Sequence, residues 1–236
     1  MKISLLCPTR ERPAWMERFV LSARNTVYEE PNVEIVFFID DNDHISLETA
    51  YNLKCTYGRI KIINYPPKTV NLTDMYNKCW EAASGEIFAP INDDFVFESH
   101  HWDKYIREAF DAIPDKIGLV YGNSIEGIKV KTAKVVLGFI HKNWTDTIGR
   151  MSPPYFKFHH ADVWMRRIAE ALDRKIYLSN VDIIHYHCAK YGKISAEQRS
   201  GVTREENTKI WNMYKHEIDE ETVKLKRFIE EFRNQI

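Results

Sequence analysis

Glu86-Ile-Phe-Ala-Pro-Ile-Asn-Asp-Asp94 is a mostly apolar run that ends in acids. Residues 33–39 form a similar run, which is almost entirely β-branched or aromatic and is followed by Asp40, Asp41 and Asp43. Such runs are typical of strands buried on both faces of a parallel sheet. Because ligands of open α/β sheets bind outside the carboxyl ends of the strands, the two groups of acids are expected to border one ligand site.

Strand-like and helix-like segments alternate through the first third of the chain, as in a parallel sheet covered by helices. Further strands are expected at 2–7 and 60–64, with helices at 13–27, 46–57 and 73–85. The less regular second half shows a helix at 102–113, strands at 117–121, 134–140 and 176–187, a helix beginning near 159–162, and an amphipathic helical tail from 196. The pattern predicts one α/β, Rossmann-like domain with a mostly parallel mixed sheet, helices on both faces and C-terminal helices.

The composition is that of an ordinary globular protein, with 44% hydrophobic and 28% charged residues among 236. The net charge of -1 provides no overall field that would attract nucleic acid or an acidic membrane. Four cysteines stand far apart without a Cys-x-x-Cys pair, which argues against a zinc knuckle or a disulfide framework and favours a reducing, cytoplasmic location. No stretch approaches the ~18 consecutive apolar residues of a transmembrane segment, so a soluble protein is expected.

Crowded carboxylates such as Asp93 and Asp94 repel one another unless protons or a cation relieve them. Hard oxygen ligands suit Mg²⁺ or Mn²⁺, so a divalent ion is the economical hypothesis for this pair. Asp and Asn also end strands and form turns, and that alternative is favoured for Asp43.

Two histidines, His185 and His187, occupy alternate positions of a predicted strand, so their rings share one face. Either imidazole would complete a metal site begun by Asp94. A pair of core histidines is the alternative interpretation.

The familiar phosphate-binding loops are absent from the sequence, which contains neither Gly-x-Gly-x-x-Gly after the first strand nor a P-loop motif. A bound diphosphate would therefore be neutralised by a metal and by basic side chains. The candidates, for each of which a solvated surface charge is the ordinary role, are Arg10, Arg12, Lys68, Lys190, Lys193 and Arg199. The segment 190–204 follows the histidine pair and is either a lid over the ligand or a surface loop.

An ordered set of motifs in residues 1–97 resembles a known enzyme family. Pro8-Thr9-Arg10-Glu11-Arg12-Pro13 follows the first strand, Ile39-Asp40-Asp41 ends the second, and the stretch Tyr76-Asn77-Lys78-Cys79-Trp80-Glu81-Ala82-Ala83-Ser84-Gly85-Glu86 leads into Ile91-Asn92-Asp93-Asp94. In this order they resemble the family A (GT-A fold) nucleotide-diphospho-sugar glycosyltransferases of the family-2 type. Asp162 and the two histidines extend the resemblance, whereas the chain beyond about Ala189 carries no recognised signature.

The resemblance implies a donor site for a nucleoside-diphosphate-sugar. Pro8, Thr9 and Arg10, with Asp40 or Asp41, would hold the base and ribose. An acid that accepts a base N–H suits uracil best, which favours a UDP-sugar.

Asn92-Asp93-Asp94 would stand for the family's Asp-x-Asp motif. Asp94 would bind Mn²⁺ or Mg²⁺, and Asn92 or Asp93 would lie near the ribose or the metal's waters. His187 or His185 would complete the metal site. The Asn in the first position departs from the family motif.

The resemblance also implies a general base. Asp162, at a predicted helix start, matches the carboxylate that removes the acceptor's proton in inverting members of the family, although Ala161 replaces the usual Glu. The expected enzyme is a metal-dependent, inverting glycosyltransferase that acts on a glycan or other hydroxyl acceptor. A modified base in DNA is a less favoured acceptor, because duplex binding needs clustered Lys and Arg.

Two other functions remain as alternatives. A sugar-1-phosphate nucleotidyltransferase would use a related sheet, but its glycine-rich first loop is missing from residues 8–13. A non-catalytic nucleotide-sugar-binding module would keep the fold without turnover, and Asn92 favours it. The expected organisation is a GT-A-like domain at 1–190, with a nucleotide-binding half at 1–97 and an acceptor-side half at 98–190, followed by a lid loop and helical tail at 191–236.

Overall fold

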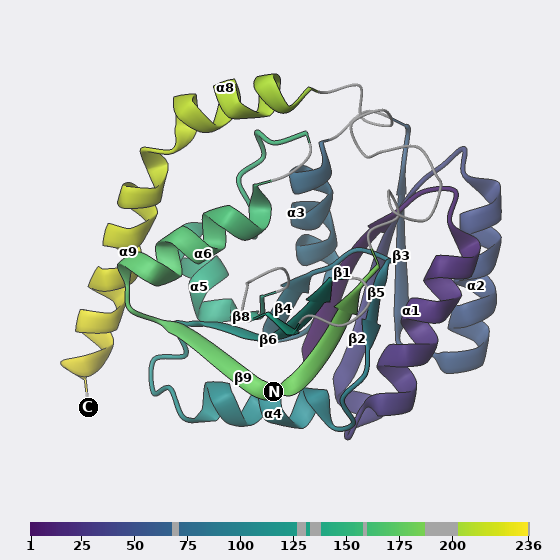
Figure 1. Ribbon diagram of the computed structural model, residues 1–236, viewed down its shortest axis with the longest axis horizontal. Helices are drawn as coiled ribbons and strands as arrows, with labels where there is room; N and C mark the ends of the chain where they lie inside the picture. The colour runs from purple at the N-terminus through teal and green to yellow at the C-terminus, as the bar shows by residue number, and fades with distance from the viewer. Residues whose placement is uncertain (68–70, 127–130, 133–137, 158–159, 187–202, 236) are drawn as a thin grey trace.

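The computed structural model describes residues 1–67, 71–126, 131–132, 138–157, 160–186 and 203–235. Its first sheet has the strand order β3-β2-β1-β4-β8 (Figure 1). The strands β1 (Ile3–Thr9), β2 (Val33–Asp40), β3 (Ile60–Tyr65) and β4 (Ile87–Pro90) are parallel, and β8 (Ile140–His141) pairs antiparallel with β4. The mostly parallel sheet predicted from the apolar runs is confirmed.

The second half of the chain adds a four-stranded sheet of order β5-β9-β6-β7. Its strands are β5 (Phe95–Phe97), β6 (Leu119–Glu126), β7 (Lys131–Thr132) and β9 (Lys175–His185). β5 pairs antiparallel with β9, whereas β6 runs parallel to it with a register shift after Gly122. The expected strand at 117–121 thus begins and ends later, and most of the strand expected at 134–140 lies outside the described residues.

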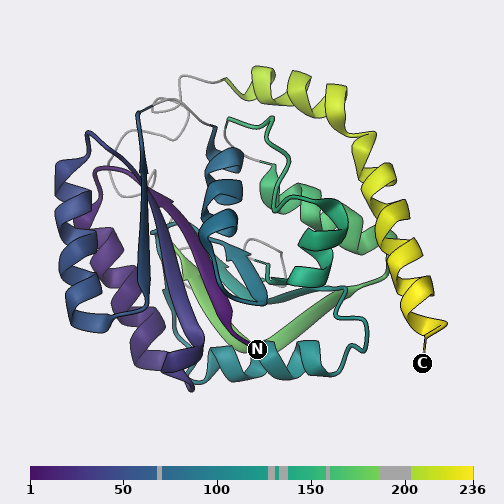
Figure 2. The ribbon, with the colours of Figure 1, turned by 180° about the vertical axis from the view of Figure 1, so that it is seen from behind.

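Two separate cores explain why the strands of the first sheet are apolar throughout. Leu5, Cys7 and Phe37 point into one core, whereas the alternating Leu6 and Phe38 point into the other. The first core is covered by α1 (Pro13–Thr26), α2 (His44–Tyr57) and α4 (Trp102–Asp111), and the second by α3 (Leu72–Ala82), α5 (Lys142–Ile148) and α6 (Ala161–Ala171). Figure 2 shows α1 and α2 separated by the sheet from α3 and the C-terminal helices.

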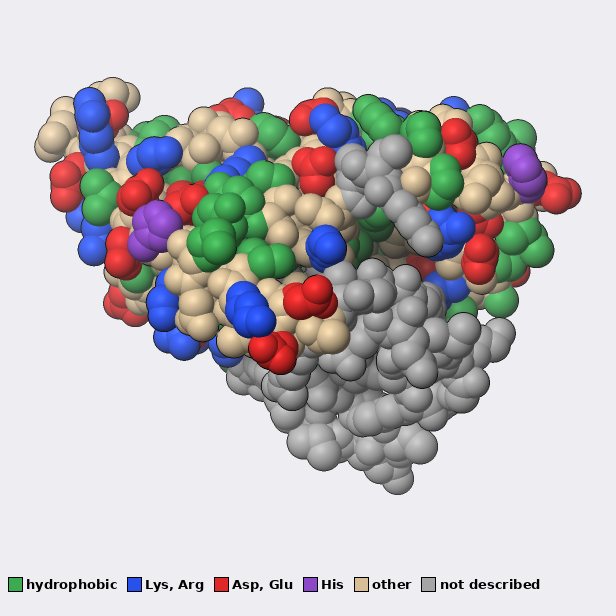
Figure 3. Space-filling view, turned by 90° about the horizontal axis from the view of Figure 1, so that it is seen from above, with side chains coloured by type: hydrophobic (Ala, Val, Ile, Leu, Met, Phe, Trp, Pro, Cys, Tyr) green, Lys and Arg blue, Asp and Glu red, His purple; other side chains and the backbone are tan. Residues whose placement is uncertain are grey.

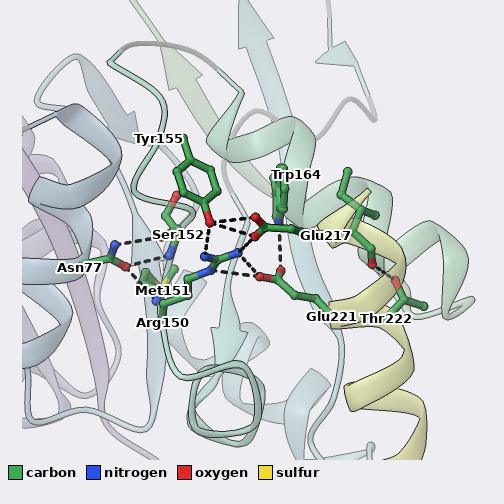
Figure 4. A network of polar contacts seen from close by, with 10 residues as sticks. Asn77, Arg150, Met151, Ser152, Tyr155, Trp164, Glu217, Glu221 and Thr222 are labelled. Carbon is green, nitrogen blue, oxygen red and sulfur yellow. Dashed lines mark hydrogen bonds and ion pairs between the residues drawn. The ribbon is translucent and has the colours of Figure 1, made fainter. Parts of the chain in front are cut away.

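The C-terminal helices α8 (Arg204–Tyr214) and α9 (Glu217–Arg233) pack back onto the second core, as the apolar stripe predicted. Leu225 is fully buried and Ile229 nearly so. Figure 4 shows how α9 is anchored: the Arg150 guanidinium pairs with Glu217 at 2.8 Å and with Glu221, to which Trp164 Nε1 also donates at 2.8 Å. The short 3-10 helix Glu30–Asn32 precedes β2.

A buried glutamate ties together the amino ends of the strands. Glu34 accepts hydrogen bonds from Lys2 Nζ at 2.7 Å, Ser4 Oγ at 2.7 Å and Ser84 Oγ at 2.8 Å. Burial opposes its ionisation, but the hydrogen bonds from Lys2, Ser84 and Ser4 outweigh it and lower the pKa of Glu34 from 4.5 to about 2. A lowered carboxyl pKa stabilises the folded state above pH 4.5, and this contribution is lost as the pH falls toward 2.

We therefore expect Glu34→Gln to lower the free energy of unfolding at pH 7 by about 2–3 kcal/mol. The difference from the wild type is expected to shrink as the pH falls from 4.5 toward 2. Urea denaturation followed by circular dichroism across this range measures it, with the exposed Glu48→Gln as control. A difference that does not change with pH would contradict the lowered pKa.

Candidate functional site

The candidate site lies where the carboxyl ends of β2, β1 and β4 meet. β1 is paired with β2 on one side and β4 on the other, so the chain order reverses at this point of the sheet. Thr9 ends β1, Asp40 ends β2, and Asn92 to Asp94 follow β4 directly. The two acid groups predicted to share one edge are therefore brought to it by β2 and β4, which lie on either side of β1.

Asp93 and Asp94 are both buried, with 1% and 7% of their surfaces exposed. Thr9 Oγ1 donates to Asp93 Oδ2 at 2.6 Å. Arg12 Nη1 lies 2.7 Å from Asp93 Oδ1, and Arg12 Nη2 lies 3.4 Å from Asp94 Oδ2. One guanidinium therefore spans both carboxylates, and the ordinary expectation of a solvated charge is wrong for Arg12, whose side chain is only 17% exposed.

Asp40, the last residue of β2, also lies at this edge of the sheet. Its Oδ2 pairs with the Arg10 guanidinium, and its buried Oδ1 has no hydrogen-bond partner among the described residues. Asp41 is exposed, and only its backbone N–H is engaged, by Tyr65 O at 2.8 Å. Pro8 is buried within β1. Of the two acids, Asp40 is therefore the one whose carboxylate is buried at this edge, whereas that of Asp41 lies on the surface.

Asp43 has the structural role that its position predicted. Its Oδ1 accepts from Ser46 N at 3.2 Å and so caps α2, while its Oδ2 accepts from Glu11 N at 2.6 Å. The second contact holds the loop after β1 against the start of α2. Asp43 thus shapes the loop that carries Arg10 and Arg12.

His185, at the end of β9, lies beside Asp94, which stands in the turn between β4 and β5. His185 Nε2 lies 3.4 Å from Asp94 Oδ1, and the imidazole stacks on Phe95 with ring centroids 4.2 Å apart. The pairing of Phe95 with His185, followed by the bond from Tyr186 N to Asp94 O at 2.8 Å, fixes this approach. His187 lies outside the described residues, as do Lys68, His159, Lys190, Lys193, Arg199 and most of the expected lid.

Asn92 is held by Tyr76, a buried residue of α3 that is not among the candidate site residues predicted from the sequence. Tyr76 Oη donates to Asn92 Oδ1 at 2.8 Å. Burial raises the pKa of the Tyr76 phenol well above its usual value, and nearby negative charges, including Asp94 and Asp162, add to the effect. The phenol therefore stays protonated and serves as a donor, which orients the Asn92 amide.

Asp162 lies in the first turn of α6 and is partly exposed. α6 packs on the second core, which also contains Tyr76, the hydrogen-bond donor to Asn92. Within the described part of the chain its side chain makes no hydrogen bond or ion pair.

The segment before Asp162 is fastened to α3. Asn77 Oδ1 accepts from the backbone N–H groups of Met151 and Ser152 at 3.0 and 2.9 Å, and Thr73 Oγ1 donates to Phe156 O at 2.9 Å (Figure 4 shows the Asn77 contacts). Phe156 and Trp144 are core residues and not an exposed platform. This fastening fixes where α6 begins.

The donor set suits a hard divalent cation. No cluster of three or more His, Cys, Asp or Glu with metal-binding geometry occurs among the described residues. Asp94 and His185 nevertheless converge from two sheets, and Mg²⁺-type ions commonly use one or two protein ligands and complete their shell with water and phosphate oxygens. The residues present therefore fit such an ion.

Comparison with known proteins decides the family. The sequence matches the family model described as glycosyl transferase family 2 over residues 4–189. The chain belongs to glycosyl transferase family 2. No curated protein matches this glycosyltransferase-family chain.

Solved structures support the GT-A fold of this family-2 chain. The S. aureus TarS structure aligns with a TM-score of 0.66 at 13% identity, covering 79% of this chain and 37% of that one. The structure of S. aureus TarS 1-349 in complex with UDP-GlcNAc aligns with a TM-score of 0.64 at 13% identity, covering 86% of this chain and 62% of that one. The mannosyltransferase PcManGT from Pyrobaculum calidifontis, in complex with GDP-Man and Mn²⁺, aligns with a TM-score of 0.62 at 12% identity, covering 79% of this chain and 57% of that one. The chain thus spans 37% to 62% of the lengths of these three structures.

No helix in the described ranges is long and apolar enough to cross a membrane. Figure 3 looks onto the end of the molecule that carries α8, and there acidic and basic side chains are interspersed over the described surface.

Proposed function

We propose that this family-2 chain transfers a sugar from a nucleoside-diphosphate-sugar to an acceptor hydroxyl. The observation that carries the proposal is the convergence of Thr9, Asp40, Asp93, Asp94 and His185 at the carboxyl edge of the parallel strands. Family membership makes this edge the expected donor site. An ordinary structural role does not account for so many buried carboxylates at one edge.

Asp40 is proposed to bind the base of the donor. Its buried Oδ1 has no hydrogen-bond partner in the described part of the chain, and a buried carboxylate oxygen favours an N–H donor. Uracil offers such an N–H, so a UDP-sugar is the proposed donor. Arg10 pairs with the other oxygen of Asp40 and would keep the carboxylate oriented toward the base, while Pro8 and Thr9 shape the pocket floor.

Asp94 and His185, with His187 as a further candidate from the sequence, are proposed to hold Mn²⁺ or Mg²⁺.

 The ion, when bound, supplies positive charge that stabilises the departing diphosphate. Asp93 is proposed to act beside it, because Thr9 fixes its carboxylate against the same site. Asn92, oriented by Tyr76, presents its amide toward the ribose or the metal's waters.

Asp162 is proposed as the general base of an inverting, single displacement. The acceptor oxygen forms a bond to the anomeric carbon while the bond from that carbon to the diphosphate oxygen breaks, and the electron pair leaves with the diphosphate. The Asp162 carboxylate takes the hydroxyl proton as the oxygen attacks. Its carboxylate at the start of α6, which is partly exposed and unpaired among the described residues, supports this role.

The proposed organisation is a GT-A-like domain at 1–190 followed by a lid loop and helical tail at 191–236. The proposed acceptor is a glycan or another hydroxyl compound. A DNA acceptor is not favoured, because the described surface in Figure 3 mixes both signs of charge. A non-catalytic nucleotide-sugar-binding module is the second candidate, and the Asn92 amide in place of a carboxylate favours it.

A thermal-shift experiment tests the donor site. A ligand at 100 times its Kd stabilises the folded state by about 2.7 kcal/mol, which corresponds to a rise in Tm of roughly 5–10 °C for a chain of this size. We expect UDP or a UDP-sugar with Mn²⁺ to produce such a rise, and GDP to produce a smaller one.

Hydrolysis or transfer of the bound UDP-sugar then separates the two candidate functions. Release of UDP that depends on Mn²⁺ supports the transferase, whereas stabilisation without any turnover supports the binding module. If no nucleoside diphosphate raises the Tm of protein shown to be folded, the donor site assigned here is wrong.

A further inference from the structure

Arg12 occupies the carboxylates that are proposed to bind the divalent ion. Its two terminal nitrogens lie 2.7 Å from Asp93 and 3.4 Å from Asp94, and His185 approaches Asp94 from the other side. The guanidinium therefore already supplies a positive charge at the oxygens that a metal would use. Two cations cannot share these oxygens without strong repulsion, because the site is largely screened from water.

The backbone of Arg12 belongs to the start of α1, whereas its guanidinium lies over the Trp15 ring, 5.6 Å from the centroid, and contacts the two carboxylates. Arg12 is the N-cap of α1, and its carbonyl accepts from the N–H groups of Trp15 and Met16 at 3.1 Å each. The side chain takes no part in the cap. A guanidinium also binds phosphate oxygens as readily as carboxylates, in the same two-pronged geometry.

We propose that Arg12 is an internal counter-cation that competes with the divalent ion for Asp93 and Asp94 and moves to the diphosphate when the donor binds. The proposal rests on the proposed function, since it assumes the same metal and donor site. Arg12 lowers the affinity for the metal in the absence of nucleotide, and this competition is relieved when Arg12 pairs with the diphosphate. Metal and nucleoside diphosphate therefore bind cooperatively, and the site stays closed to free cations.

The direct test measures Mn²⁺ binding without nucleotide, by the loss of the free-Mn²⁺ electron paramagnetic resonance signal. We expect Arg12→Gln to bind Mn²⁺ about tenfold more tightly than the wild type, because the competing charge is gone. Arg18→Gln is the matched control, since Arg18 carries the same charge on the same helix but is exposed and stacks on Tyr186. The control is expected to leave the Kd for Mn²⁺ unchanged.

A second measurement tests whether Arg12 contributes to the binding of the diphosphate. By isothermal titration calorimetry, Arg12→Gln is expected to bind UDP about tenfold more weakly than the wild type in the absence of metal. The effect of Mn²⁺ on UDP affinity should shrink in the variant. Adding Asp94→Ala to Arg12→Gln should abolish the gain in Mn²⁺ affinity, since the contested ligand is then missing.

The outcomes separate this inference from the proposed function. An unchanged or weaker Mn²⁺ affinity in Arg12→Gln, in protein whose circular dichroism spectrum is native, would overturn the inference even if UDP still binds. If Arg12→Gln binds Mn²⁺ more tightly but the wild-type protein binds no nucleoside diphosphate, Arg12 competes with the metal for the carboxylates. The proposed move of Arg12 to the diphosphate is then wrong. Arg12→Lys, which keeps the charge, should retain most of the wild-type competition.

Discussion

Replacing Asp162 with asparagine is expected to lower kcat by about 10²- to 10⁴-fold, because the acceptor hydroxyl loses its proton acceptor while the carboxamide keeps the shape of the side chain. The donor is bound by other residues, so the Kd for UDP and the rise in Tm that it causes should not change. The fold should lose no more than roughly 1 kcal/mol, which is what a negative charge in the first turn of a helix contributes.

The measurement is single-turnover transfer at saturating donor, with UDP affinity determined on the same samples. Glu170→Gln is the matched control, because Glu170 is an exposed acid on the same helix and pairs with Lys175. Transfer by Asp162→Asn at close to the wild-type rate would remove Asp162 as the base. A loss of UDP affinity in parallel with kcat would instead assign Asp162 to the donor site.

The first half of the fold was predictable because of where its strands lie. Each central strand sends alternate residues into two cores, so a continuous apolar run carries the signal, and the acids that follow mark the carboxyl edge. The second sheet was harder to predict. β6 extends through Gly122 and Asn123, beyond the end of the strand expected at 117–121, and an added Cβ at Gly122 would collide with Val181 O.

The candidate site also contains residues that local sequence pattern identifies and residues that it does not. Residues that follow strand ends, such as Asp40 and Asp94, were identified from local pattern alone. Arg12 and Tyr76 take their roles from contacts with the turn after β4, which is distant in sequence from Arg12. Such contacts depend on the strand order of the sheet, and periodicity within a segment carries no information about them.

Asp94→Ala is expected to remove metal-dependent transfer, with a loss of about 10²- to 10³-fold or more, because the variant can no longer hold the charge that stabilises the departing diphosphate. Stability should change little. Arg12 keeps its 2.7 Å contact with Asp93, and removal of one of two adjacent carboxylates relieves their repulsion.

The decisive observation is the dependence on metal, measured as transfer rate and as the Tm with UDP, each with Mn²⁺ and after chelation. In the wild type both should fall on chelation, whereas in Asp94→Ala both should be low and insensitive to Mn²⁺. Asp111→Ala, which removes an exposed acid at the end of α4, should behave as the wild type. A wild-type transfer rate in Asp94→Ala would show that this carboxylate does not hold the ion, and the buried pair with Arg12 would then be a structural ion pair at the edge of the sheet.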